Sequence, residues 1–217
     1  MFPLYDQYRL IGKNPQVLRI IIGLNIILFL FSFSDLEGFI FKFGLIPERI
    51  FQGEAFFTLF SSMFFHGGFS HLFGNMWFLW VFGDNLEKRL GKIKFLLFYL
   101  ICGFFSGLCY LLLAPDKNIP AVGASGAISG ILGAYLILFP RHKIVSLVPI
   151  FFFLQFLAVP VFVFIFIWFL YQLFYIGTET MVAYWAHIGG FLTGIFLTRF
   201  LVSKKSSQSY LVWSKQP

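Results

Sequence analysis

Six long apolar segments, separated by short polar ones, constrain the fold of this chain more than any other feature of its sequence. They cover residues 17–33, 65–82, 95–114, 121–139, 160–176 and 181–202. A helix needs about 20 apolar residues to cross a bilayer core of roughly 30 Å. The composition agrees, because only 12% of the 217 residues are charged, whereas soluble domains have about 25%. We therefore predict an all-α, polytopic bundle of six transmembrane helices.

The apolar run from residue 144 to residue 176 is too long to be one span. A single helix of that length would extend about 50 Å. Pro149 and Pro160 interrupt it, and proline breaks a helix interior. The sequence therefore predicts an interfacial or re-entrant piece over residues 144–158 and a fifth span that begins at Pro160. The apolar connection over residues 34–64 is expected to lie against the membrane or to pack into the bundle.

The positions of the basic residues orient these spans. With a cytoplasmic amino terminus, only Lys42, Arg49 and Lys117 of the 16 Lys and Arg residues lie outside. Cytoplasmic loops carry an excess of Lys and Arg, so both termini are predicted to be cytoplasmic. The chain then divides into a cytoplasmic segment (1–16), a transmembrane domain (17–202) and a cytoplasmic polar tail (203–217). Topology accounts for the net charge of +7, so membrane lipids, and not nucleic acid, are the expected partners.

Polar residues inside the predicted spans are candidates for function, because such groups are costly in lipid unless they have partners. None of the nine Asp and Glu residues falls within a span. This argues against an intramembrane aspartyl protease and against a proton-coupled carrier. The chain also lacks an H-E-x-x-H zinc motif, and nothing else suggests a metal site. The candidates that remain are His66, His71, Asn75, Ser125, Ser129 and His187.

The predicted depths of these residues agree with one another. If the fourth span begins near Pro120, Ser125 lies about 7.5 Å below the outer surface. On the same basis His187 lies about 12 Å deep and His71 about 10 Å deep, with Asn75 one turn deeper. Four polar side chains from three helices are therefore expected at one level, open to the non-cytoplasmic side.

The residue types at this level suit acyl-transfer chemistry. A serine hydroxyl becomes a good nucleophile when a neutral histidine takes its proton, so Ser125 and His187 would form a dyad. The Ser125 backbone N–H, the Asn75 amide and the His71 ring could stabilise an oxyanion.

Glycines surround the candidate serine. Gly123 and Gly126 flank Ser125 and permit close backbone approach. The spacings Gly126-x-x-x-Gly130 and Gly190-x-x-x-Gly194 are typical of helices in close contact. Alone, a glycine-flanked serine could be a packing motif and His187 a core histidine; the matched depths favour the catalytic interpretation. We expect His66, nearer the surface, to order the adjoining loop by hydrogen bonds.

Four motifs carry a resemblance to a known family: HGGFSHLFGN at 66–75, NLEKRLG at 85–91, GASG at 123–126 and AHIGG at 186–190 with Gly194. In this order the chain resembles the rhomboid family from about residue 54 to residue 197. The resemblance implies a six-helix bundle with Ser125 as nucleophile, His187 as base, and His71 and Asn75 as oxyanion donors. It assigns helix packing to Gly190 and Gly194. It further implies cleavage of single-pass membrane proteins in or near their transmembrane helix, with small residues preferred before the bond and no metal or cofactor.

The chain departs from the family pattern at Ser129. Some members have a tyrosine there, four residues after the nucleophile, which packs against the catalytic histidine. We therefore expect His187 to be held by a hydrogen bond from Ser129 or by an aromatic side chain elsewhere.

Two other functions remain open. An inactive rhomboid-like binder or chaperone of transmembrane clients would use the same bundle, although such relatives usually lose the serine or the histidine. A transporter or channel would be expected to show membrane-embedded acids or an inverted repeat. In a bacterium, the expected location is the inner membrane, with the site facing away from the cytoplasm.

Overall fold

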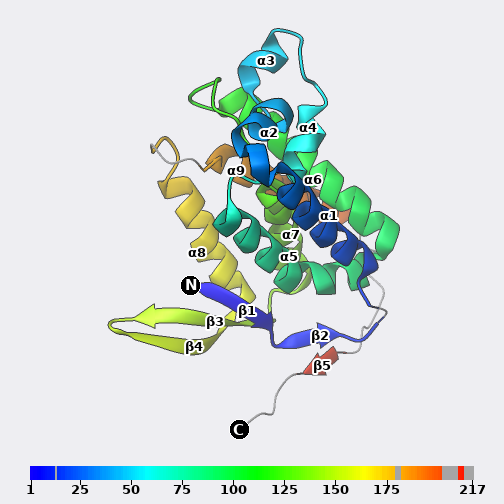
Figure 1. Cartoon of the computed structure of the whole chain (residues 1–217). Coiled ribbons are helices and arrows are strands. Elements are labelled where there is room, and N and C mark those ends of the chain that lie inside the picture. The colour runs from blue at the N-terminus through cyan, green and yellow to red at the C-terminus, as the bar shows by residue number, and fades with distance from the viewer. Residues whose placement is uncertain (13, 179–181, 202–209, 213–217) are drawn as a thin grey trace.

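The computed structural model describes residues 1–12, 14–178, 182–201 and 210–212 and is mostly helical (Figure 1). Its α-helices are α1 (Gln16–Ser32), α2 (Leu36–Phe43), α3 (Pro47–Phe51), α4 (Thr58–Ser61), α5 (Phe69–Leu90), α6 (Lys92–Leu113), α7 (Ser125–Leu138), α8 (Val161–Phe174) and α9 (Tyr184–Leu201). The 3₁₀ turns are η1 (Phe33–Asp35) and η2 (Ser62–Phe64), and the strands are β1 (Phe2–Asp6), β2 (Tyr8–Leu10), β3 (Lys143–Ile150), β4 (Phe153–Pro160) and β5 (Tyr210–Val212).

A helix lies at each of the six apolar segments, namely α1, α5, α6, α7, α8 and α9. By length and composition, Gln16–Phe43 and α6 could each cross a membrane, and α7 and α8 are shorter apolar helices. That all six cross a membrane remains a prediction. The beginning of the sixth segment lies outside the described residues, as does the predicted polar tail apart from β5.

Helix α7 lies at the centre of the bundle and packs against α9 and α6. Every residue from Gly126 to Tyr135 is buried. A methyl group on Gly190 or Gly194 would overlap the backbone of α7 at Gly126 or Gly130. Small residues let membrane helices approach this closely, so the two glycine motifs bring the helices that carry Ser125 and His187 into backbone contact.

The all-α prediction needs a correction, because the structure contains a small sheet. β3 and β4 form an antiparallel hairpin, and β1 adds to β3, in the order β1-β3-β4. Residues 144–158 therefore belong to two strands and the turn between them, while their interfacial or re-entrant placement remains a prediction. Valine, isoleucine and phenylalanine favour strands, and Pro149 would break a helix. The last β3 residue opposite β1 is Leu147, so Pro149 lies beyond that pairing. α8 begins directly after Pro160, where the fifth span was predicted to start.

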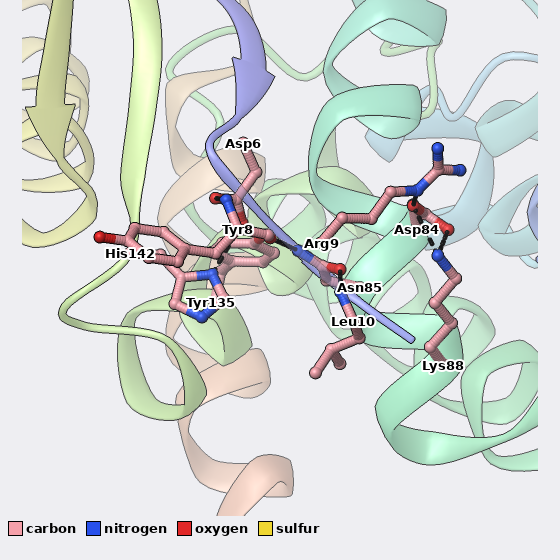
Figure 2. Close-up of polar contacts among 9 residues, drawn as sticks. All are labelled: Asp6, Tyr8, Arg9, Leu10, Asp84, Asn85, Lys88, Tyr135 and His142. Carbon is pink, nitrogen blue, oxygen red and sulfur yellow. Dashed lines mark hydrogen bonds and ion pairs between the residues drawn. The ribbon is translucent and has the colours of Figure 1, made fainter. Parts of the chain in front are cut away.

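The amino-terminal segment, which the sequence describes only as cytoplasmic, is bound to the ends of α5 and α7 (Figure 2). The Asp6 carboxylate accepts hydrogen bonds from the Tyr135 hydroxyl and from Asn85 Nδ2, and lies 2.8 Å from His142 Nδ1. Beside it, Arg9 and Lys88 both pair with Asp84. The amino-terminal segment, with β1 and β2, thus joins segments that are far apart in the sequence.

Residues 34–64 pack into the bundle at the opposite end. The buried apolar side chains of this connection include Leu45, Ile46, Ile50, Leu59 and Met63. Leu45 pairs with Ala121 through two backbone hydrogen bonds of 2.9 Å, while Phe51, Phe56 and Phe57 are exposed. The connection therefore supports the segment that precedes Ser125.

Candidate active site

Ser125 is the first residue of α7. We expected this helix to begin near Pro120, but residues 121–124 are not helical: Ala121 forms a β-bridge with Leu45, and the chain turns at Gly123 and Ala124. Gly123 has a φ of +118°, a conformation that side chains disfavour, and its N–H donates to Ser62 O at 2.8 Å. Because the first N–H groups of a helix lack intrahelical partners, the Ser125 N–H lies where it can bind an anion.

The hydroxyl of Ser125 contacts His187. Ser125 Oγ lies 2.8 Å from His187 Nε2, and both residues are half-buried. His187 lies in the first turn of α9, so two helix starts supply the pair. This is the geometry in which an imidazole can take a proton from a hydroxyl.

The other ring nitrogen of His187 contacts a residue that the sequence reasoning missed. His187 Nδ1 lies 2.7 Å from Oε1 of Gln172 on α8, and Gln172 is only 3% exposed. The sequence did contain a signal, because Gln172 is a polar residue within the otherwise apolar predicted span 160–176. The rule that polar groups in a membrane segment are functional candidates would have selected it.

Two of the other candidates lie beside the turn that precedes Ser125. A methyl group on Gly123 would lie 2.8 Å from His71 Nε2 and 3.8 Å from Asn75 Nδ2. His71 Nδ1 accepts a 3.3 Å hydrogen bond from the Gly67 N–H, so in the neutral ring the proton is on Nε2, which faces the turn. Asn75 Nδ2 donates to His71 O at 2.9 Å and has a second hydrogen to offer.

His66 and Ser129 do not make the contacts that the sequence predicts. His66 is fully buried, and among the described residues neither of its ring nitrogens has a hydrogen-bond partner, so it does not order the loop in the expected way. Its ring instead lies edge-on to His71, with the centroids 5.2 Å apart. The Ser129 hydroxyl donates to Ser125 O at 2.7 Å and not to His187, whose Nδ1 contacts Gln172 Oε1 instead. The rings of Trp168 and Tyr184 are the aromatic neighbours of His187, each with its centroid 6.3 Å away.

A small cavity of about 30 Å³ adjoins Ser125. Its walls are mostly small side chains, including Gly103, Ser106, Gly126 and Ala186, with Met63 among the few larger ones. A methyl group on Gly126 would overlap the Ser106 hydroxyl. The space beside the serine can therefore accept only a small group.

Comparison with known proteins places this geometry in a family context. A model of the Rhomboid domain matches residues 53–204. The chain is 33% identical over 183 residues to RHOMBOID-like protein 6, mitochondrial, of Arabidopsis thaliana, a match that covers 81% of this chain and 52% of that protein. It is 32% identical over 151 residues to Rhomboid protein 1, mitochondrial, of Saccharomyces cerevisiae, covering 67% of this chain and 42% of that protein.

Bacterial proteins match over shorter stretches. The putative rhomboid protease YdcA of Bacillus subtilis is 38% identical over 78 residues, which are 36% of this chain and 39% of that protein. The chain thus spans about half, or less, of the length of these relatives. Since the two longer matches are to mitochondrial proteins, the comparisons do not support the expected bacterial inner membrane; they support membership of a membrane-embedded family.

Proposed function

Because the chain belongs to the rhomboid family, we propose that it is an intramembrane serine endopeptidase that cleaves single-pass transmembrane proteins in or near their membrane helix. The observation that carries the proposal is the 2.8 Å contact between Ser125 Oγ and His187 Nε2. A hydroxyl paired with an imidazole base is the arrangement of a nucleophilic hydrolase.

The proposed reaction uses Ser125 and His187 as a dyad. His187 Nε2 accepts the proton of Ser125 as Oγ attacks the scissile carbonyl, and then gives that proton to the leaving amine. Water next attacks the acyl-enzyme while His187 again acts as the base, and the hydroxyl of Ser125 is restored. Both half-reactions need only these two side chains for proton transfer.

Three donors are available for the oxyanion that forms in each half-reaction. They are the Ser125 N–H at the start of α7, His71 Nε2 and Asn75 Nδ2. Donors already fixed in place stabilise a developing charge more effectively than water does. The His66 ring packs edge-on against the ring of His71 and supports it.

The small cavity beside Ser125 supports a preference for a small side chain before the cleaved bond. We propose that the substrate helix enters between α5 and α8 and unwinds partly to reach Ser125. In the proposed topology both termini are cytoplasmic and the site opens to the other side of the membrane. Membrane lipids surround the bundle.

Cleavage of a single-pass reporter in proteoliposomes tests the proposal. We expect wild type to cleave and Ser125→Ala and His187→Ala to lose cleavage by at least a hundred-fold, since general base catalysis contributes about 10²–10⁴-fold. A fluorophosphonate should label Ser125 in the wild type alone. Equal cleavage by all three proteins would refute the dyad.

The same experiment distinguishes the inactive alternative. A binder or chaperone of transmembrane clients would retain the reporter in pull-down but would neither cleave it nor react with the fluorophosphonate.

A further inference from the structure

We infer that Gln172 is a positioning residue for the proposed dyad and that it selects the tautomer in which His187 can act as a base. This inference rests on the proposed function. Its structural basis is the 2.7 Å contact between His187 Nδ1 and Gln172 Oε1, which joins α9 to α8.

The orientation of the Gln172 amide follows from its second contact. Gln172 Nε2 lies 3.1 Å from Trp168 O, a carbonyl that can only accept a hydrogen bond. The amide NH₂ must therefore face Trp168, and the amide oxygen must face His187. No other assignment of the two ends satisfies both contacts.

The oxygen of Gln172 in turn determines where the proton of His187 lies. An amide oxygen only accepts, so Nδ1 of the neutral ring must carry the hydrogen. Nε2 is then unprotonated and accepts the hydrogen bond from the Ser125 hydroxyl at 2.8 Å. With the proton on Nε2 instead, the ring could not take the serine proton. Gln172 thus occupies the position of the third residue of a triad, without a charge.

This role also explains how the chain works without the tyrosine that some family members have after the nucleophile. The Ser129 hydroxyl donates to Ser125 O and therefore does not hold the ring of His187. Gln172 fixes the ring by a directional bond, with Trp168 and Tyr184 around it.

The test compares Gln172→Met, which keeps the length of the side chain but removes both amide groups, with Gln172→Glu, which keeps the acceptor oxygen. Gln155→Met makes the same chemical change on the β3–β4 hairpin, remote from the site, and serves as the matched control. We expect kcat for the reporter to fall at least tenfold in Gln172→Met with KM changed less than twofold. The kcat of Gln172→Glu should stay within about threefold of the wild-type value. The kcat of Gln155→Met should equal the wild-type value.

Nitrogen-15 NMR of histidine-labelled wild type provides a readout that does not depend on activity. We expect His187 to carry its proton on Nδ1 in wild type and to lose that preference in Gln172→Met. A wild-type His187 protonated on Nε2 would overturn the inference, as would a Gln172→Met protein with wild-type kcat. If wild type shows the Nδ1 proton but cleaves nothing, the proposed function fails while the contact stands.

A different observation carries a second inference, independent of catalysis. The β3–β4 hairpin is mostly apolar, since residues 144–160 contain no charged side chain and only Ser146 and Gln155 are polar. It projects away from the helices beside α8 (Figure 1). At its tip Phe151 is 94% and Phe152 98% exposed. A sheet with one face in water normally alternates apolar and polar residues.

The turn of the hairpin is costly for its residue type. Phe151 has a φ of +52°, a conformation usually taken by Asn or Gly in two-residue hairpin turns. Aromatic side chains at the tip are therefore not explained by the needs of the fold, and they bury nothing within the described chain.

The surroundings of the hairpin indicate what covers it. Phe162 and Phe166, in the first half of α8 directly after β4, are also exposed. Arg141 and Lys143 are exposed at its base, where they complement anionic headgroups. β4 is the edge strand, and its outer backbone groups need water or headgroups, which the hydrocarbon core does not supply.

We propose that this hairpin lies in the headgroup region of the leaflet opposite the Ser125 site, with its aromatic tip inserted to the boundary of the acyl chains. A spin label at Phe152→Cys, in a Cys102→Ala, Cys109→Ala protein reconstituted in liposomes, tests this placement. Asn118→Cys in an exposed loop is the aqueous control, and Phe166→Cys on α8 is the lipid control.

We expect the label at position 152 to collide with oxygen more often, and with a water-soluble nickel chelate at least fivefold less often, than the label at position 118. Nickel collisions equal to those at position 118 would overturn the proposal. Dipolar broadening between labels at position 152 would show that a second copy covers the hairpin, and would also overturn it.

Discussion

Gly123 links backbone conformation to the proposed oxyanion site at the scale of one residue. Its φ of +118° turns the chain into α7, and its missing side chain leaves room for His71 Nε2. Alanine at this position would meet both a strained backbone and the His71 ring. The residue is therefore constrained twice.

We expect Gly123→Ala to reduce cleavage at least tenfold, because the new methyl group would displace His71 from the turn. Gly53→Ala is the matched control: Gly53 also has a positive φ, +84°, but open space around it. This control should lose a little stability, about 1 kcal/mol, and keep its activity. Similar kcat losses in both variants would show that backbone strain, and not the contact with His71, is responsible.

The sequence predicts some of these residue roles and not others, for physical reasons. The proximity of Ser125 and His187 could be predicted because polar side chains at equal depth inside a membrane are costly unless they have partners. Gln172 differs from the amide of Asn75 in belonging to no motif and lying in a span with no other candidate, so nothing in the sequence places it beside His187. The role of Ser129 was wrong because a hydroxyl in a helix can bond to the carbonyl four residues earlier, as it does here.

At the scale of elements, the contact between α7 and α9 determines whether Ser125 and His187 meet. Gly194 lies against the backbone of α7 at Gly130, two turns from His187. We expect Gly194→Ala to lower stability by about 1–3 kcal/mol, the usual cost of overpacking, and to lower the melting temperature in detergent accordingly. Cleavage should also fall, because the helices separate.

Gly74→Ala is the matched control for that substitution. Gly74 lies in α5 with no atom within 4 Å of the added methyl group, so alanine should raise the melting temperature slightly through its helix propensity. If Gly194→Ala melts at or above the wild-type temperature, the two helices do not depend on glycine for their contact.

Helix positions follow from the apolar segments, but two element boundaries do not. The start of α7 at Ser125 depends on the turn at Gly123 and on the pairing of Leu45 with Ala121, a contact between distant residues. The β3–β4 hairpin is extended by β1, which pairs with β3 and which no local pattern in the sequence predicts. Hydrophobicity alone does not separate short strands from helix segments.

At the scale of the whole molecule, the polar network around Asp6 and the Ser125 site occupy opposite ends of α7. Tyr135, which donates to Asp6, lies ten residues beyond Ser125, about 15 Å along the helix at roughly 1.5 Å per residue. The network joins β1, α5, α7 and the segment before β3. It is therefore expected to support the fold without taking part in the chemistry.

Asp6→Ala tests that separation of stability from chemistry. The substitution removes the acceptor that Tyr135, Asn85 and His142 share. Asn85 Nδ2 keeps its contact with Tyr8 O, but the buried Tyr135 hydroxyl loses the carboxylate to which it donates, and an unsatisfied buried group costs about 1–3 kcal/mol. We expect a melting temperature several degrees below wild type, with unchanged kcat per folded molecule at low temperature. Asp116→Ala, in an exposed loop, should change neither. A fall in kcat at an unchanged melting temperature would mean that α7 transmits the state of its far end to Ser125.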